Sequence, residues 1–251
     1  MKRFKRYLKI ISFLIVFIIG FLLVYSYGPY EADATMEDFI LVSNNITIDE
    51  DFDEISYQVL DPIGNIIIIP GGKVKAEAYK YMANSLALEG YNVTIYKPLL
   101  NLSILAGNYP KRFLDDNLDN IVIGHSLGGV TASNLASKVE VDTVVLLGSY
   151  STKDISDTNV LSIIAENDLV INQSNYDENK DNLGNYTENT VIGGNHSQFG
   201  FYSNQNKFYA GGVSKTGGGI NLLISNSTGT TWAADPDTTS RMDIYNIACF
   251  R

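Results

Sequence analysis

Apolar residues follow three patterns along the chain, and each pattern predicts a different element. A nearly unbroken apolar and aromatic run covers residues 10–27, which is just long enough for a helix to cross the hydrocarbon layer of a membrane. Short runs of β-branched residues, such as residues 66–69, are typical of strands buried on both faces of a parallel sheet. Apolar residues at helical spacing predict a helix over residues 76–89, and Gly90 ends it.

Strand-like and helix-like stretches alternate through most of the chain. This alternation predicts an α/β fold in which a mainly parallel sheet is covered by helices on both faces. A further helix is predicted around residues 109–117. The predicted strands cover residues 46–48, 54–60, 66–69, 93–96, 121–124, 143–148, 160–165 and 190–192.

Charges of opposite sign flank the N-terminal apolar run. Five basic residues lie within residues 1–9, whereas the residues after the run are acidic. This asymmetry predicts an uncleaved membrane anchor over residues 1–30, with the N-terminus inside the cell and the rest of the chain outside. A cleaved signal peptide, which would give a secreted protein, is the alternative, although residues 32–34 (Ala-Asp-Ala) form a poor cleavage site well beyond the apolar run.

Composition divides the chain after the anchor. Residues 31–54 are acidic and rich in Asn, which predicts a spacer that lifts the domain from the membrane. The α/β domain is expected over residues 55–205. Residues 206–251 are rich in Gly, Ser, Thr and Asn and have poor helix propensity, with short strands predicted at 220–224 and 243–248. Three interpretations of this tail are open: an extension of the domain, a partner-binding element or an aberrant C-terminus.

Charge and composition exclude several classes of function. The chain has 18 Lys and Arg residues against 28 Asp and Glu residues, and five of the basic residues precede the apolar run, so the remainder is strongly acidic. Such a domain repels phosphate backbones, and nucleic acid is not an expected partner. Cys249 is the only cysteine, and His125 and His196 are the only histidines. These counts exclude an intramolecular disulfide and multi-cysteine or three-histidine metal sites, and we expect no metal and no cofactor.

Residues 121–129 (I-V-I-G-H-S-L-G-G) join an apolar strand to a helical stretch through the pattern G-x-S-x-G. In a nucleophile elbow, this pattern makes a sharp turn that exposes a serine hydroxyl above the sheet edge. Small residues are needed at Gly124 and Gly128 because the backbone crosses itself closely there. Ser126 is therefore the candidate nucleophile.

A serine hydroxyl becomes a good nucleophile only when a base within hydrogen-bond reach takes its proton. His125 is fixed next to Ser126 in the turn and is expected to point away from the hydroxyl. His196, which follows the last predicted strand of the domain, is therefore the candidate general base and later general acid. Asp168 follows an earlier strand and is the candidate that orients His196, with Glu166 as the alternative.

Acyl transfer also needs hydrogen-bond donors for a developing oxyanion. The backbone N–H of Leu127, directly after the candidate nucleophile, is expected to be the first donor. The second is expected from the turn at residues 70–73 (P-G-G-K), which follows an earlier central strand. The Gly72 N–H is the favoured donor in this turn, and Lys73 is the alternative.

Four stretches of the chain carry a family resemblance: P-G-G-K-V at 70–74, K-P-L-L-N-L at 97–102, G-H-S-L-G-G at 124–129 and G-N-H-S-Q-F-G at 194–200. They resemble the α/β-hydrolase family, in particular small bacterial esterases similar to dienelactone hydrolase. The elbow alone is shared by many lipases and esterases, but the elbow together with an N-H-x-Q-F-G segment is much more specific. The resemblance runs from about residue 56 to residue 205, and it implies an α/β-hydrolase fold with a Ser-His-Asp triad formed by Ser126, His196 and Asp168.

Together these patterns predict a membrane-anchored serine hydrolase that cleaves a carboxylic ester or related acyl bond through an acyl-enzyme. Only 11 residues separate the strand ending at Gly148 from the one starting at Val160, where large lids usually enter the fold. An open site without a large lid is expected, suited to small or extended soluble acyl substrates. Two alternatives are an acyltransferase and a non-catalytic surface module for adhesion or protein binding. The patterns specify neither the acyl-chain length nor the oligomeric state.

Overall fold

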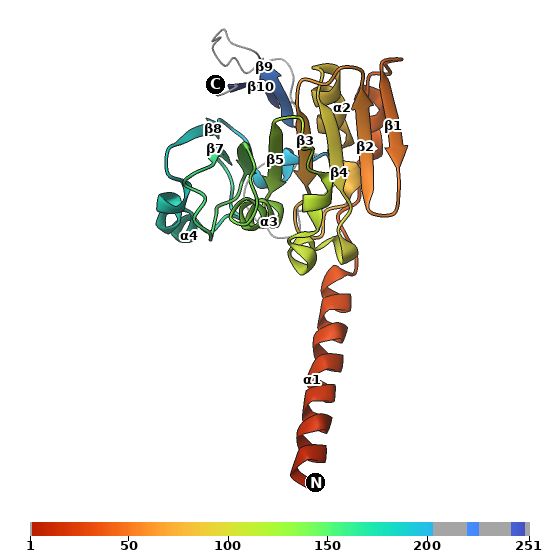
Figure 1. Ribbon diagram of the computed structural model, residues 1–251, viewed down its shortest axis with the longest axis vertical. Coiled ribbons are helices and arrows are strands. Elements are labelled where there is room, and N and C mark those ends of the chain that lie inside the picture. Colours follow the sequence, from red (N-terminus) through yellow and green to blue (C-terminus); the bar gives the residue numbers. More distant parts are fainter. Residues whose placement is uncertain (1, 203–219, 226–241, 249–251) are drawn as a thin grey trace.

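An eight-stranded sheet forms the centre of the domain in the computed structural model, which describes residues 2–202, 220–225 and 242–248 (Figure 1). The strand order is β1-β2-β4-β3-β5-β6-β7-β8. The pairs β1–β2 and β2–β4 are antiparallel, and the other pairs are parallel, so the mainly parallel sheet is confirmed. The strands are β1 (Ile46–Glu50), β2 (Glu54–Val59), β3 (Asn65–Ile69), β4 (Asn92–Tyr96), β5 (Asn120–His125), β6 (Thr143–Leu147), β7 (Asn159–Ala165) and β8 (Tyr186–Val191).

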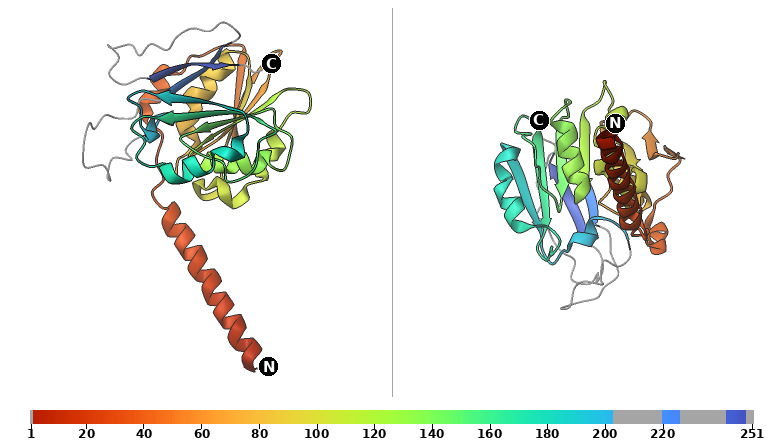
Figure 2. Two further views of the ribbon diagram at one scale, coloured as in Figure 1. Left: turned by 90° about the vertical axis from the view of Figure 1, so that its left-hand side faces the viewer. Right: turned by 90° about the horizontal axis from the view of Figure 1, so that it is seen from below.

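Helices cover both faces of this sheet. The central strand β3 reads N-I-I-I-I and is buried along its whole length, as a strand between two helical layers must be. Ile66 and Ile68 belong to the core that includes α2 (Lys80–Leu88), whereas Ile67 and Ile69 belong to the core that includes α3 (Leu127–Ala136). Figure 2 shows these two helices on opposite sides of the sheet.

The remaining helices are short. The helix predicted over 76–89 begins as the 3-10 turn η2 (Ala76–Tyr79) and continues as α2. The helix predicted around 109–117 is only the 3-10 turn η5 (Tyr109–Phe113), because the Asn120 side chain binds both the N–H and the carbonyl of Asp115 and holds that backbone out of a helix. The others are α4 (Gln173–Glu178), η1 (Ala34–Phe39), η3 (Leu99–Asn101), η4 (Ser103–Ala106), η6 (Lys180–Leu183) and η7 (His196–Phe199).

Residues 31–54 pack on the domain, which differs from the spacer that the sequence predicts. The Tyr30 N–H donates to the Lys73 carbonyl, and the Tyr30 carbonyl accepts from the Lys75 N–H. Met36 is buried, and β1 forms the edge of the main sheet. Most acidic side chains of this segment are exposed, whereas Asp53 is buried and forms an ion pair with Arg112.

The N-terminal helix α1 (Lys2–Ser26) stands out from the domain (Figures 1 and 2). In the described part of the chain it is the one helix long and apolar enough to cross a membrane, over Phe4–Tyr25, and its apolar side chains are exposed. It leaves the domain at the end where β4 gives way to η3, and α1 contacts η3. The carboxyl ends of the parallel strands therefore lie on the side of α1.

Two further strands lie at the opposite end of the domain in Figure 1. β9 (Ile220–Ser225) and β10 (Met242–Ala248) pair in parallel and match the two short strands predicted in the tail. β9 lies against α2. The rest of the predicted tail over 206–251 lies outside the described residues.

Candidate active site

A strained turn places Ser126 at the end of β5. Its backbone has φ 52° and ψ −121°, a conformation that residues other than glycine rarely adopt. The Ser126 N–H donates to the Leu147 carbonyl at 2.9 Å. The Ser126 carbonyl accepts from the Gly129 N–H at 3.0 Å and from the Ser149 hydroxyl at 2.6 Å. The turn is thus held by hydrogen bonds on both sides of the strained residue.

Close backbone contacts explain the two glycines of the elbow. A Cβ atom on Gly124 would lie 2.4 Å from the Gly129 Cα. A Cβ atom on Gly128 would lie 2.1 Å from the Ile69 carbonyl oxygen. No real Cβ atom approaches backbone so closely, so the geometry requires glycine at both positions.

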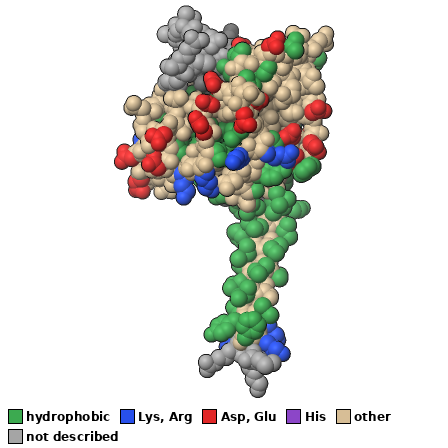
Figure 3. Space-filling model, in the orientation of Figure 1, with side chains coloured by type: hydrophobic (Ala, Val, Ile, Leu, Met, Phe, Trp, Pro, Cys, Tyr) green, Lys and Arg blue, Asp and Glu red, His purple; other side chains and the backbone are tan. Residues whose placement is uncertain are grey.

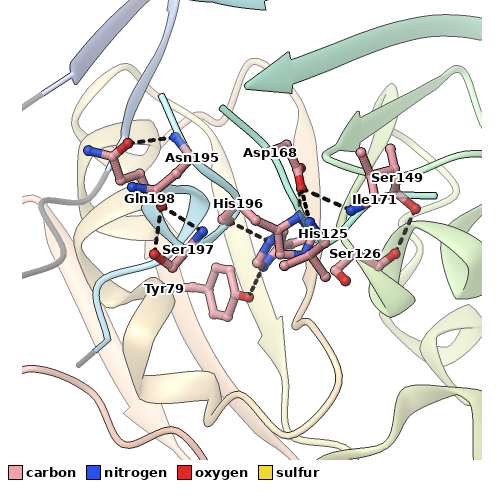
Figure 4. A network of polar contacts seen from close by, with 11 residues as sticks. Tyr79, His125, Ser126, Ser149, Asp168, Ile171, Asn195, His196, Ser197 and Gln198 are labelled. Atoms are coloured by element: carbon pink, nitrogen blue, oxygen red, sulfur yellow. Dashed lines mark hydrogen bonds and ion pairs between the residues drawn. The ribbon is translucent and has the colours of Figure 1, made fainter. Parts of the chain in front are cut away.

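His196 is held by Asp168 in the interior of the domain. The His196 Nδ1 lies 2.7 Å from the Asp168 Oδ2, and the two side chains are only 4% and 1% exposed (Figure 4). The other carboxylate oxygen, Oδ1, accepts from the N–H groups of Val170 and Ile171 at 2.9 Å each. The His196 Nε2 is buried and has no hydrogen-bond partner in the described part of the chain.

The charge state of Asp168 fixes the tautomer of His196. Burial alone would raise the pKa of Asp168, but the hydrogen bond and charge of His196 and the two backbone N–H groups outweigh it, so the pKa lies below its ordinary value of 3.8. Asp168 is therefore an anion that can only accept hydrogen bonds. The proton of a neutral His196 must then sit on Nδ1, which leaves a lone pair on the unpartnered Nε2.

The three candidate residues follow β5, β7 and β8 at the carboxyl edge of the sheet. His196 is hydrogen-bonded to Asp168, whereas the Ser126 hydroxyl makes no hydrogen bond to the His196 Nε2. Gly148 lies close to all three residues. A Cβ atom added to Gly148 would lie 3.0 Å from both the Asp168 Oδ2 and the His196 Nδ1. The preceding residue, Leu147, accepts the hydrogen bond from the Ser126 N–H. Figure 4 shows Ser126, His196 and Asp168 next to one another. The alternative acid, Glu166, binds the Gly193 N–H instead, through its Oε2 at 2.7 Å.

The two residues expected to supply the oxyanion donors, Gly72 and Leu127, lie in contact. A Cβ atom on Gly72 would lie 3.1 Å from the Leu127 Cδ2. Leu127 is the first residue of α3, where the N–H has no acceptor within the helix. In the turn after β3, the Gly71 and Lys73 N–H groups are bound, to the Tyr79 hydroxyl and the Asn101 carbonyl. The Lys73 N–H is therefore occupied, and the Gly72 N–H is the donor of this turn that stays available.

The sequence did not indicate a buried chain of hydrogen bonds that joins this turn to His196. The Gly71 N–H donates to the Tyr79 hydroxyl at 3.0 Å, and that hydroxyl lies 2.6 Å from the His125 Nδ1. The His125 Nε2 lies 3.1 Å from the His196 carbonyl, which can only accept, so Nε2 carries the proton and Nδ1 accepts from Tyr79. Both ring nitrogens of His125 are thus occupied, which agrees with its expected role away from the serine hydroxyl.

His125 gives the domain a predictable pH dependence. Burial lowers the pKa of His125 well below its ordinary value of 6.5, and the neighbouring His196 lowers it further. Below pH 6.5 the unfolded chain binds a proton there that the folded chain does not, so the free energy of unfolding falls as the pH falls. We expect this group to remove about 2 kcal/mol between neutral pH and pH 5.

Urea unfolding of the full chain in detergent measures this effect. His125→Gln keeps a hydrogen-bond donor but does not titrate, so its free energy of unfolding should depend less on pH over the same range. An equal loss in the wild type and the variant would assign the pH dependence to other groups.

Sequence reasoning also missed Ser149, whose hydroxyl binds the Ser126 carbonyl. Its position directly after Gly148, at the carboxyl end of a central strand, is a signal that could have drawn attention to it. Within residues 2–202 and the two described strands of the tail, no group of three or more His, Cys, Asp or Glu side chains is arranged to hold a metal ion.

Comparison with known proteins places the chain in a family. Residues 65–215 match the alpha/beta hydrolase family, and the chain therefore belongs to that family, as its motifs predicted. No curated protein matches the chain.

The chain is also similar to solved structures at low sequence identity. A predicted CIB-like hydrolase from Thermoplasma acidophilum is 14% identical, with a TM-score of 0.49 over 61% of this chain and 91% of that one. TT1662 from Thermus thermophilus is 10% identical, with a TM-score of 0.48 over 60% and 90%. Est1E from Butyrivibrio proteoclasticus is 15% identical, with a TM-score of 0.45 over 61% and 90%.

Proposed function

We propose that the protein is a membrane-anchored serine hydrolase that cleaves a carboxylic ester or related acyl bond through an acyl-enzyme on Ser126. The observation that carries this proposal is the buried His196 Nε2, which has no partner among the described residues while Asp168 holds the other ring nitrogen. Leaving such an atom unpartnered costs about 1–3 kcal/mol, and the strained backbone of Ser126 costs a similar amount. A non-catalytic module gains nothing from either cost.

In the first half of the reaction, the Ser126 Oγ attacks the carbonyl carbon of the ester while the His196 Nε2 takes the hydroxyl proton. The carbonyl π electrons move onto oxygen, and the N–H groups of Gly72 and Leu127 donate to the resulting oxyanion. When the tetrahedral intermediate collapses, the bond to the leaving oxygen breaks and His196 returns the proton to it. An alcohol leaves, and the acyl group stays on Ser126.

In the second half, water takes the place of the alcohol. His196 removes a proton from the water as its oxygen attacks the acyl carbon, and the same two N–H groups stabilise the second oxyanion. Collapse breaks the bond to Ser126, whose oxygen regains the proton from His196. Asp168 remains an anion throughout and stabilises the imidazolium that forms twice in the cycle.

Retention of α1 as an anchor, with the domain outside the cell, is part of the proposal. The basic N-terminus and the apolar span support this orientation. Packing supports retention, because Tyr30 pairs with Val74 and Ala32 pairs with Tyr202. Cleavage after the Ala-Asp-Ala segment at residues 32–34 would remove both pairs from the domain.

A fluorophosphonate probe tests the nucleophile. We expect the full-length protein to be labelled covalently, because the probe reacts with an activated serine, and we expect Ser126→Ala to remove all labelling. Ser137→Ala, on an exposed serine just after α3, is the matched control and should keep full labelling. Labelling at equal levels in Ser126→Ala would contradict the proposal, and an unlabelled wild type with the native fold would favour the non-catalytic module.

A further inference from the structure

The candidate oxyanion turn touches the end of the membrane helix. The Lys73 Nζ lies 5.5 Å from the centroid of the Tyr25 ring and 6.0 Å from that of Tyr30. Tyr25 is the last residue of the apolar span, and Lys73 directly follows the candidate donor Gly72. Tyrosine and lysine side chains at the end of a span lie at the level of the lipid headgroups. The turn therefore lies at that level as well.

The connection between helix and domain is too short to lift the site away from this level. α1 ends at Ser26, and Tyr30 is already bound to Lys73 and Lys75. The residues between, 27–29, span at most about 10 Å when fully extended. The spacer that the sequence predicts is absent from this connection, because residues 31–54 pack on the domain.

Exposed apolar side chains lie in the turns beside the base of α1. Leu99 lies in η3, which contacts α1, and Ile104 and Leu105 lie in the next turn, η4. Their exposed fractions are 72%, 53% and 45%. Figure 1 shows these yellow-green turns at the end of the domain from which α1 leaves. We call these three side chains the membrane-facing surface.

The positive charge of the domain near the base of α1 is complementary to anionic lipid headgroups. On the face shown in Figure 3, most Lys and Arg side chains of the domain lie in its lower part, toward α1, whereas Asp and Glu side chains are spread over the face. Lys73 makes no ion pair with any described residue, so its charge is free to meet lipid phosphates. An acidic domain that turns its basic side chains toward its anchor is oriented toward an anionic bilayer.

We propose that the carboxyl edge of the sheet rests on the bilayer that α1 crosses, and that the substrate is an amphiphilic ester resident in that bilayer. The inference rests on the proposed function and deepens it. It replaces the soluble substrate that the short β6–β7 connection predicted. Residues 148–158 contain no helix that could form a lid, and the membrane takes the place of a lid at this edge of the sheet. An ester whose carbonyl lies at headgroup level reaches Ser126 without leaving the leaflet.

Hydrolysis in vesicles tests the substrate class. The full-length protein is reconstituted in vesicles of phosphatidylcholine and phosphatidylglycerol and assayed with two p-nitrophenyl esters, one with a short water-soluble acyl chain and one with a long chain that partitions into the bilayer. For the triple variant Leu99→Ser, Ile104→Ser and Leu105→Ser, we expect the ratio of long-chain to short-chain kcat/KM to fall about tenfold.

The matched control is the double variant Leu60→Ser and Ile63→Ser, in the exposed turn between β2 and β3 at the opposite edge of the sheet. Its ratio should equal that of the wild type. An unchanged ratio in the triple variant, or a wild type that hydrolyses only the short ester, overturns the bilayer proposal and leaves the hydrolase proposal standing. A wild type that hydrolyses neither ester and is not labelled by the fluorophosphonate probe overturns both.

A measurement of depth tests the orientation independently of catalysis. In a Cys249→Ser background, a fluorophore is attached through Leu99→Cys or, as control, Leu60→Cys, and the vesicles contain lipids brominated close to the headgroup. Quenching at position 99 without quenching at position 60 supports the proposal. Equal quenching at both positions, or none at position 99, overturns it.

Discussion

Asp168→Asn is expected to lower kcat for ester hydrolysis by about 10⁴-fold while the domain keeps its fold. The reason lies in the two backbone bonds to the Oδ1 of Asp168. The N–H groups of Val170 and Ile171 need an acceptor, so the carboxamide must turn its oxygen toward them and its NH₂ group toward His196. A donor facing Nδ1 forces the imidazole proton onto Nε2, which can then no longer accept the proton of Ser126.

The matched control is Glu166→Gln, which alters the other acid considered from the sequence. Glu166 is exposed and binds the Gly193 N–H, a bond that glutamine can also accept. Its kcat should stay within a few-fold of the wild type, because it does not touch the imidazole. Steady-state hydrolysis of a short p-nitrophenyl ester, with circular dichroism to verify the fold, measures both variants. If kcat falls strongly in Glu166→Gln and only slightly in Asp168→Asn, Glu166 rather than Asp168 is the acid that orients His196.

The parts of the fold that could be predicted are those that short sequence patterns determine. The run of four isoleucines in β3 can only be a strand between two helical layers, and the structure buries all four. The G-x-S-x-G pattern could be recognised because its two glycines are sterically required: the backbone at Gly124 and Gly128 leaves no room for a side chain. Two histidines in the chain left a single choice of base, and the order of the strands placed it beside Asp168.

The parts that could not be predicted depend on contacts between distant segments. The acidic, Asn-rich composition of residues 31–54 predicted a spacer. In the structure β1 pairs with β2, and the composition does not reveal this pairing. Tyr79 reads as one apolar position in a helix, yet its hydroxyl connects Gly71 to His125. The helix predicted after Tyr109 fails because the Asn120 side chain captures the backbone there.

The contact between Lys73 and Tyr25 also joins segments that are distant in the sequence. Of these contacts, it has the largest effect on the substrate that we expect. From the sequence, the anchor and the open site are separate features, and an open site favours soluble substrates. In the structure the turn that holds Gly72 meets the end of α1. On our proposal that α1 is an anchor, this contact sets the position of the candidate site relative to the lipid. The short connection over residues 27–29 is the reason that the proposal gives the anchor a part in substrate access.

Gly128→Ala is expected to destabilise the domain by more than about 3 kcal/mol and to leave little soluble folded protein. The added Cβ would lie 2.1 Å from the Ile69 carbonyl oxygen and 2.6 Å from that of Pro70, and both are backbone atoms. Neither can rotate away, because Ile69 is paired with Gly124 in the centre of the sheet. Relief requires the first turn of α3 to move off β3, which separates the Leu127 N–H from the Gly72 N–H.

Gly107→Ala is the control for this substitution. The nearest atom to its Cβ position is the Asn134 Nδ2 at 2.9 Å, the end of a side chain that can rotate, so its free energy of unfolding should change by less than about 1 kcal/mol. Urea unfolding of the detergent-solubilised full chain compares the two variants. If Gly128→Ala unfolds like the wild type, the close approach of α3 to β3 is not rigid. The two proposed oxyanion donors, the N–H groups of Gly72 and Leu127, would then have to be assembled by the substrate.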